Sequence, residues 1–119
     1  MKNKDFAKGL EKRTRTFALS ILKISSSLPR TPEGTIIRKQ ICRSGSSIGA
    51  NYREANRARS IAEFKSKIGI CESETSETLY WLEIIQEVRM LNSQEIINLY
   101  YETKELLAIF TSIGKNIKH

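Results

Sequence analysis

The chain has few of the residues that metal and catalytic sites require. Its 119 residues include one histidine, His119 at the C-terminus, and two cysteines, Cys42 and Cys71. A zinc site needs several closely spaced ligands, and histidine is the commonest acid–base catalyst. The sequence also has no Cys-x-x-Cys pair, phosphate loop or nucleophile motif. It therefore predicts a protein that is not an enzyme and that binds no metal or cofactor.

Long apolar runs are missing as well. No stretch approaches the roughly 18 apolar residues that a membrane span needs. Lys23 interrupts the apolar segment near the N-terminus, and no signal-peptide cleavage site follows it. Two cysteines far apart in sequence are typical of a reducing compartment, where they pack as small hydrophobic residues. We therefore expect a cytoplasmic protein with no membrane contact.

Helix breakers are scarce: there are six glycines and two prolines, and both prolines, Pro29 and Pro32, lie in one short stretch. Proline-free segments leave room for long helices. Apolar residues recur at helical spacing in four segments, which we expect to be residues 5–27, 32–56, 61–90 and 93–117. Short links between them make successive helices antiparallel neighbours. The predicted fold is all-α, an antiparallel up-down four-helix bundle that forms one domain over residues 1–119.

Capping signals and apolar stripes define the expected ends and inner faces of these helices. Ser60 and Glu63 have the spacing of a capping box, and so do Asn92 and Glu95, which makes Asn92 or Ser93 the start of the last helix. The first helix is expected to bury Phe6, Leu10, Phe17, Ile21, Ile24 and Leu28. The second is expected to bury Ile37, Ile41, Ser44, Ile48 and Ala55. The third is expected to bury Ile61, Phe64, Ile68, Cys71, Thr75, Thr78, Leu82 and Ile85. The fourth is expected to bury Ile96, Tyr100, Leu107, Phe110 and Ile117.

The middle of the second helix is built from small residues, among them Gly45 and Gly49. A glycine inside a helix costs about 1 kcal/mol relative to alanine. We expect a close backbone approach to compensate for this cost, either to another helix of the bundle or across a subunit interface.

A polar stripe runs beside the apolar stripe of the same helix. It consists of Gln40, Arg43, Ser47, Asn51 and Glu54. Polar groups at the edge of a core need partners, and Glu72, Thr75 or Ser76 of the third helix could supply them. Two interpretations stay open: a buried network that fixes packing or subunit register, and a surface that binds a ligand or nucleic acid.

The same stretch resembles the signature of a protein family encoded in intervening sequences of bacterial 23S rRNA genes. That signature reads roughly Gln-x-x-Arg-Ser, then Ser-Ile-x-x-Asn-x-x-Glu-Gly, and then a Glu-Phe helix start. The matching motif residues are Gln40, Arg43, Ser44, Ser47, Gly49, Asn51 and Glu54. Residues 72–82 are similar to the pattern of the family's third helix. Ala55 departs from the signature, because many members have glycine there.

The resemblance implies a four-helix bundle that assembles as a homo-oligomer, with a pentamer as the expected form. Members are similar to the accessory variability determinant of diversity-generating retroelements, a basic bundle thought to bind nucleic acid and a reverse transcriptase. The expected partners are therefore further copies of the chain, RNA or DNA, and a reverse transcriptase or a ribosomal component.

Positive charge is concentrated in the first half of the chain. Residues 1–60 contain 14 Lys/Arg against four Asp/Glu, whereas residues 61–119 contain six against nine. The net charge is +7, and its uneven distribution favours an anionic partner or the acidic half of a neighbouring subunit. The candidates for phosphate contact are Lys8, Lys12, Arg13, Arg15, Arg53, Arg57 and Arg59.

Two other interpretations of these surfaces stay open. The basic residues can be a solvated face that only keeps the protein in solution. The protein can also be a scaffold or adaptor for another protein, because tyrosine and tryptophan favour binding hot spots. The residues that would anchor such an interface are Tyr80, Trp81, Tyr100 and Tyr101.

Overall fold

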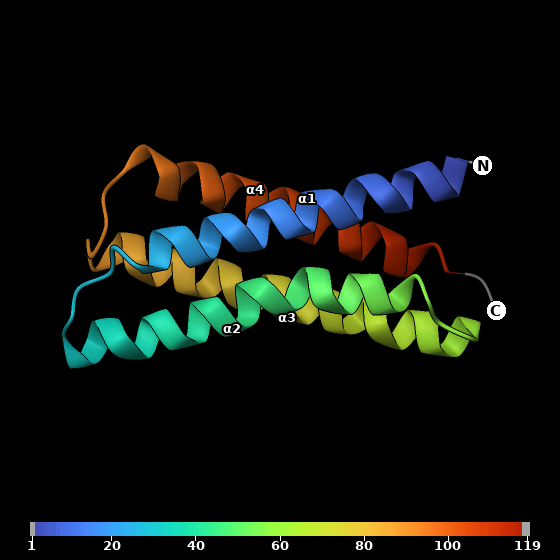
Figure 1. The fold of residues 1–119 in the computed structure, drawn as a ribbon, viewed down its shortest axis with the longest axis horizontal. Helices are drawn as coiled ribbons and strands as arrows, with labels where there is room; N and C mark the ends of the chain where they lie inside the picture. The colour runs from blue at the N-terminus through green and yellow to red at the C-terminus, as the bar shows by residue number, and fades with distance from the viewer. Residues whose placement is uncertain (1, 118–119) are drawn as a thin grey trace.

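Four helices account for nearly all of the described chain. The computed structural model describes the backbone of residues 2–117 and the side chains of residues 4–117. Met1, Lys118 and His119, which the predicted domain includes, lie outside the described residues. The helices are α1 (Lys2–Ser25), α2 (Pro32–Ala55), α3 (Ile61–Glu87) and α4 (Gln94–Lys115). Successive helices run antiparallel (Figure 1), so the prediction of an all-α up-down bundle is confirmed.

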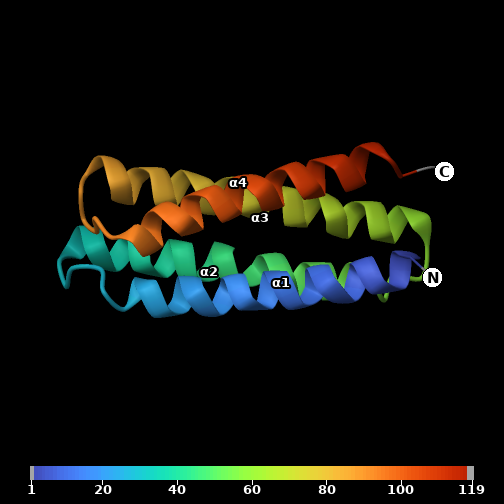
Figure 2. The same ribbon diagram turned by 90° about the horizontal axis from the view of Figure 1, so that it is seen from above.

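The helices form two layers along a rod of 46 × 22 × 19 Å. Figure 2 shows α1 beside α2 in one layer and α3 beside α4 in the other, with both chain ends at the same end of the rod. The sequential pairs pack extensively, whereas α1 and α4 meet over a much smaller area. The seam between α1 and α4 is therefore the loosest in the bundle.

The predicted helix ends were one to three residues too late at all four helices, and α1 begins at Lys2, three residues before its predicted start. Hydrogen bonds explain the earlier ends of α1 and α3. The first helix ends at Ser25, two residues before the expected end, and the Ser25 hydroxyl donates to the carbonyl of Leu22 at 2.8 Å. The third helix ends at Glu87 instead of residue 90. Arg89 adopts a left-handed φ of 57°, and the next N–H, that of Met90, bonds back to Ile85 O at 3.1 Å. This Schellman arrangement terminates α3 without the glycine that usually marks it.

The capping predictions succeed at α3 and fail in part at α4. The Ser60 hydroxyl accepts from the Glu63 N–H at 3.0 Å, as the capping box predicts. The Glu63 carboxylate reaches one residue further than expected and accepts from the N–H of Arg59 at 3.1 Å. At α4 the cap is Ser93, whose hydroxyl accepts from the Ile96 N–H, so the expected box starting at Asn92 is wrong.

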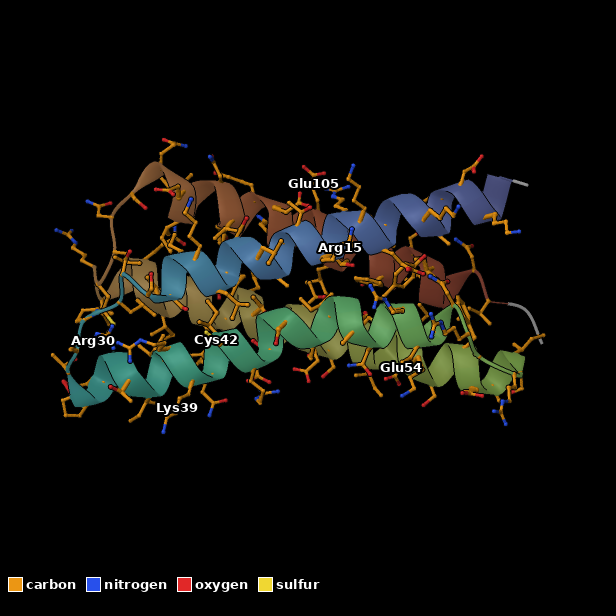
Figure 3. All side chains as sticks on the ribbon, in the orientation of Figure 1. Arg15, Arg30, Lys39, Cys42, Glu54 and Glu105 are labelled. Carbon is orange, nitrogen blue, oxygen red and sulfur yellow. The ribbon has the colours of Figure 1, made fainter. Side chains whose placement is uncertain are left out.

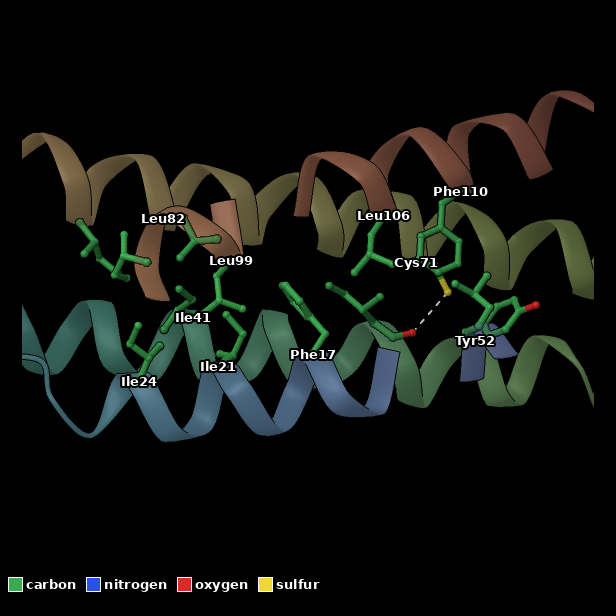
Figure 4. Close-up of a cluster of buried hydrophobic side chains, with 14 of the residues drawn as sticks. Phe17, Ile21, Ile24, Ile41, Tyr52, Cys71, Leu82, Leu99, Leu106 and Phe110 are labelled. Atoms are coloured by element: carbon green, nitrogen blue, oxygen red, sulfur yellow. Dashed lines mark hydrogen bonds between the residues drawn. The ribbon is translucent and has the colours of Figure 1, made fainter. Parts of the chain in front are cut away.

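The core follows the predicted stripes of α2 closely and those of the other helices with exceptions. Figure 4 shows its centre, where side chains from all four helices meet. Phe6 and Ile61 were expected inside but are 53% and 51% exposed. They lie near the helix ends, where no neighbouring helix covers them. The residues of α4 that are buried are Ile96, Leu99, Thr103, Leu106 and Phe110. Tyr100, Leu107 and Ile117 are half-buried, because the inner face is shifted by one position from the expected stripe.

Several hydroxyl groups are buried in this core, and each has a hydrogen-bond partner. Thr14, Thr75 and Thr103 donate to the carbonyl four residues earlier in their own helices. Thr78 also bonds to the hydroxyl of Ser44 across the α2–α3 interface at 2.8 Å. A buried hydroxyl without a partner would cost roughly 1–3 kcal/mol. These bonds explain how α3 keeps a polar middle inside a bundle.

The small residues of α2 let α1 approach its backbone closely. A Cβ built on Gly45 would lie 2.9 Å from Cγ2 of Ile21, and one built on Gly49 would lie 3.0 Å from Oγ1 of Thr14. Both distances are below ordinary van der Waals contact. The expected close approach is thus found within the bundle, between α1 and α2.

Replacing Gly45 with leucine should destabilise the protein by about 2 kcal/mol, because overpacking a filled interface typically costs 1–3 kcal/mol. Gly69→Leu is the matched control, since a Cβ on Gly69 meets nothing within 4 Å. The control should gain up to about 1 kcal/mol from better helix propensity. Urea unfolding followed by circular dichroism measures both changes. Equal effects of the two substitutions would contradict close packing of α1 on α2.

Candidate nucleic-acid interface

Because the charge is uneven along the sequence, the two layers of the bundle differ in net charge. The basic half of the chain, residues 1–60, supplies α1 and α2 and therefore one layer. The half with excess carboxylates supplies α3 and α4 in the other layer. The molecule thus presents a basic layer on one side and an acidic layer on the other.

A groove of about 420 Å³ runs between α1 and α2 in the basic layer. Ser46, Gly49 and Ala50 line it from α2, and Ala18 lines it from α1. Because these side chains are small, the helices approach closely and the groove remains accessible to solvent. Gly49 therefore takes part both in the close contact of α2 with α1 and in the lining of this surface. We call it the α1/α2 groove.

Three arginines line the α1/α2 groove, and each is exposed. Arg15 comes from α1, Arg53 from the last turn of α2 and Arg57 from the link that follows. Within the described part of the chain, none of the three guanidinium groups has an ion pair or hydrogen bond. Figure 3 places Arg15 near the middle of α1 and Glu54 on α2, further toward the end of the rod where the termini lie.

The two carboxylates that also line the groove are already bound to other groups. Glu11 accepts from the side-chain amide of Asn56 at 2.8 Å. Glu54 accepts from the ammonium group of Lys67 at 2.7 Å, and this hydrogen bond holds the pKa of Glu54 below its usual value. Neither carboxylate pairs with an arginine of the groove. The three guanidinium groups are therefore available to an external anion.

Arg13, which the sequence analysis placed among the phosphate contacts, binds carboxylates of α4. Its guanidinium donates to both oxygens of Glu102 at 2.6 and 2.7 Å and to Glu105 at 2.8 Å. Hydrogen bonds to these two carboxylates raise the pKa of Arg13. Arg13 therefore joins α1 to α4 across the loosest seam, and we do not include it in the candidate interface.

The other predicted phosphate contacts lie around the groove at different positions. Lys12 lines a second groove, between α1 and α4, together with Arg13. Lys8 is exposed on α1 and lines neither of these two grooves. Arg59 is exposed on the link between α2 and α3 and lines a pocket at the end of the bundle. The structure thus brings together Arg15, Arg53 and Arg57 but not the whole predicted set.

The polar stripe of α2 contacts α3, as the sequence analysis expected, but through different partners. Arg43 donates to Glu74 at 3.2 Å and to Glu77. The ion pair with Arg43 and a hydrogen bond from Trp81 lower the pKa of Glu77. Hydrogen bonding to these carboxylates raises the pKa of Arg43. The expected partners were Glu72, Thr75 and Ser76. Glu72 instead accepts from Thr111 of α4, and Thr75 bonds within its own helix.

The remaining motif residues have mostly local roles. Ser44 is buried and bonds to Thr78, and Gly49 packs against Thr14. Ser47 donates to the carbonyl of Ser44, and Asn51 donates to that of Ser47. Gln40 is half-buried near the same edge. The motif therefore mainly fixes how α2 packs on its neighbours, and Gly49 and Glu54 are the members that also line the groove.

Sequence reasoning missed the acidic partners of the two arginines, although a signal for them exists. Glu74 and Glu77, and likewise Glu102 and Glu105, are three residues apart and share one helix face. Each pair binds a single arginine from the opposite layer. Which arginine pairs with which face depends on the packing of the bundle, so the pattern alone did not identify the contact.

Neither cysteine belongs to the interface. Cys71 is buried, its thiol donates to the carbonyl of Ile48 at 3.5 Å (Figure 4), and burial raises its pKa to about 12. Cys42 is half-buried, not buried as expected, and donates to the Ser25 hydroxyl at 3.1 Å. Within the described residues, no group of three or more His, Cys, Asp or Glu side chains could hold a metal. None of the helices in that part is long and apolar enough to span a membrane.

The fold and the groove together define a class: an antiparallel four-helix bundle with one basic layer. Comparison with known proteins narrows this class. The model of the family described as 23S rRNA-intervening sequence protein matches residues 10–117, so the chain belongs to that family.

A solved structure supports the assignment. The crystal structure of a protein of unknown function from the S23 ribosomal protein family of Bacteroides thetaiotaomicron is 32% identical in sequence to this chain. The two superpose with a TM-score of 0.83, over 92% of this chain and 98% of the other. No curated protein matches the chain.

Replacing Arg43 with glutamine should lower the free energy of unfolding at pH 7 by about 0.5–1 kcal/mol, because the ion pairs are partly exposed. A lowered pKa of Glu77 means that its stabilisation is present at neutral pH and is lost as the pH falls through the folded-state pKa, below the ordinary value of 4.5. The variant and the parent protein should therefore converge in acid. Denaturant unfolding at a series of pH values measures this.

Arg53→Gln is the control for that experiment, because it removes the same charge from α2 at a site without an ion pair. Its stability should follow that of the parent protein at every pH. A constant gap between Arg43→Gln and the parent down to pH values where carboxylates are protonated would rule out the proposed role of Glu77.

Proposed function

We propose that this protein is a non-enzymatic nucleic-acid-binding protein whose α1/α2 groove contacts the phosphate backbone. One observation carries the proposal: Arg15, Arg53 and Arg57 converge on one groove and have no carboxylate partner among the described residues. Elsewhere in the bundle, Arg13 and Arg43 are each bound to two glutamates. The groove thus gathers three guanidinium groups that, among the described residues, bind no carboxylate.

Guanidinium groups suit phosphate because they donate parallel hydrogen bonds and displace condensed counterions. Arg53 lies in the last turn of α2 and Arg57 on the link just after it, and both line the groove, so we propose that they contact the same strand. Arg15 faces them from the other wall of the groove. Contacts of this kind position a nucleic acid without reading its sequence. We therefore propose sequence-tolerant binding.

We take RNA before DNA as the ligand, because the family is defined by sequences that interrupt 23S rRNA genes. This choice is part of the proposal and is tested by the same binding experiment. A single-stranded DNA of equal length in that experiment distinguishes the two ligands. Tighter binding of the DNA would reverse the choice.

We also propose that copies of the chain assemble, with the pentamer implied by the family resemblance as the expected form. The separation of charge between layers supports assembly, since the basic layer of one copy can face the acidic layer of the next. Several subunits would bring several grooves to one nucleic acid, which increases the overall affinity. A reverse transcriptase or a ribosomal component remains a proposed partner of such an assembly.

A second candidate function is a scaffold that binds another protein. Its supporting observation is that two tyrosines are largely exposed, Tyr80 at 53% and Tyr101 at 59%. Exposed aromatic residues are frequent anchors of protein interfaces. A protein partner retained at high salt, together with no binding of nucleic acid, would favour this function over the first.

Replacing Arg15, Arg53 and Arg57 with glutamine should weaken binding of a short single-stranded RNA. In a plot of the logarithm of the binding constant against the logarithm of the salt concentration, the slope should become shallower by about 2. Each phosphate contact on a single strand contributes about 0.7 to this slope, and three contacts are lost. Fluorescence anisotropy titrations at several salt concentrations measure both quantities. The substitutions lie at exposed positions, so circular dichroism should show an intact fold.

The matched control removes the same net charge from the other layer, with Arg89, Lys104 and Lys115 replaced by glutamine. It should retain the salt dependence of the parent protein and most of its affinity. If both triple variants lose affinity equally, the protein responds only to net charge and the groove has no specific role. If the parent protein shows no salt-dependent RNA binding, the proposed function is wrong.

Native mass spectrometry should give a particle of five times the 13.6 kDa subunit mass. Raising the salt concentration before the measurement should reduce its abundance, because attraction between oppositely charged layers is screened. A spectrum containing only the single subunit at low salt would exclude the proposed assembly. An oligomer with another number of subunits would exclude the pentamer but leave the proposed assembly in place.

A further inference from the structure

A third hollow, of about 770 Å³, lies at the end of the bundle where both termini are found. We call it the end pocket. It lies between the start of α1, the link from α2 to α3 and the last turns of α4. The motif residues of α2 and the three groove arginines do not line it.

The end pocket has aromatic and aliphatic walls that water can reach. Phe6 is 53% exposed, Ile61 is 51% exposed, and Phe64 and Ile113 are half-buried. In the described part of the chain, neither Phe6 nor Phe64 has a ring contact with another aromatic side chain. A large apolar side chain exposed to water loses the free energy that its burial would supply. About half of the Phe6 side chain is thus available to an apolar partner.

The rim of the same pocket is polar and basic. Asn56 and Ser60 supply amide and hydroxyl groups, and Arg59 supplies an exposed guanidinium without a side-chain partner in the described residues. The carboxylate of Glu63, in the first turn of α3, accepts from the backbone N–H of Arg59 and not from its guanidinium. A ligand that fits this chemistry has a flat ring, polar edges and a negative charge next to the ring.

The end pocket adjoins the α1/α2 groove. The hydrogen bond from Asn56 to Glu11 joins a residue of the pocket to a residue of the groove. Arg57 lines the groove, and Arg59, two residues further along the link, lines the pocket. A chain of phosphates lying along the groove therefore reaches the mouth of the pocket.

We propose that the end pocket takes an unpaired base of an RNA strand whose phosphates lie in the α1/α2 groove. The proposal rests on the proposed function and names its substrate class, single-stranded RNA. Bases in a duplex are stacked and paired, so only an unpaired base can leave the strand and stack on a protein side chain. Stacking accepts any base because every base has a flat ring face, which agrees with sequence-tolerant binding.

The test compares a short single-stranded RNA with a blunt-ended duplex of the same sequence, each titrated against the parent protein and two variants. The parent protein should bind the single strand about tenfold more tightly than the duplex, the usual order for one stacked base. Phe6→Ala should remove this preference and leave duplex binding unchanged. Phe6→Tyr keeps a ring at the position and should retain the preference.

Tyr80→Ala is the matched control, because Tyr80 is exposed to the same 53% but lies on α3, outside the end pocket. It should bind both RNAs like the parent protein. A fluorescent base analogue in the single strand gives an independent readout, since its emission should be quenched by the parent protein and not by Phe6→Ala.

The outcomes separate this inference from the proposed function. If the groove arginines control RNA affinity but Phe6→Ala behaves like the parent protein, the end pocket holds no base and the groove proposal stands. If the parent protein binds the duplex and the single strand equally well, the end pocket likewise holds no base and the groove proposal stands. If no RNA binds in a salt-dependent way, both proposals are overturned.

Discussion

The close packing of α1 on α2 is the constraint on which the rest of the structure depends. Gly45 and Gly49 leave no room for a Cβ against Ile21 and Thr14, so the two helices approach more closely than ordinary side chains permit. Gly49 also lines the α1/α2 groove, together with Ser46 and Ala50 of the same helix. Gly45 lies on the buried side of α2, where a larger residue would meet Ile21.

Charge is arranged in two ways on this scaffold. At the interfaces between the layers, Arg13 and Arg43 each bind a pair of glutamates three residues apart and so fix the register of α1 on α4 and of α2 on α3. On the outer surface of the basic layer, Arg15, Arg53 and Arg57 lack such partners within the described residues. The first arrangement stabilises the bundle modestly because it is partly exposed. The second leaves a field that an external polyanion can satisfy.

Much of the fold could be predicted from the sequence because helical periodicity is a local property. The stripe of Ile37, Ile41, Ser44, Ile48 and Ala55 is buried as expected, and Ser60 caps α3 as its spacing indicates. The errors arise where local signals are nearly degenerate. Leu99 and Tyr100 both follow Ile96 at an allowed helical spacing, and only packing selected Leu99 for the core. Phe6 looked like a core residue because its spacing is right, but no helix covers it.

The sequence by itself determined the four helices, their antiparallel order, the need for a close neighbour at the glycines of α2 and the excess of positive charge in the first half. Each of these follows from residues near one another in the chain. Only the tertiary structure decided that α1 is that neighbour and that the end pocket adjoins the groove. It also decided that Arg13 is bound by Glu102, whereas Arg15 has no ion-pair partner among the described residues. These features depend on contacts between residues distant in sequence. Helical spacing fixes the face of each residue, but the packing of the bundle decides what that face meets.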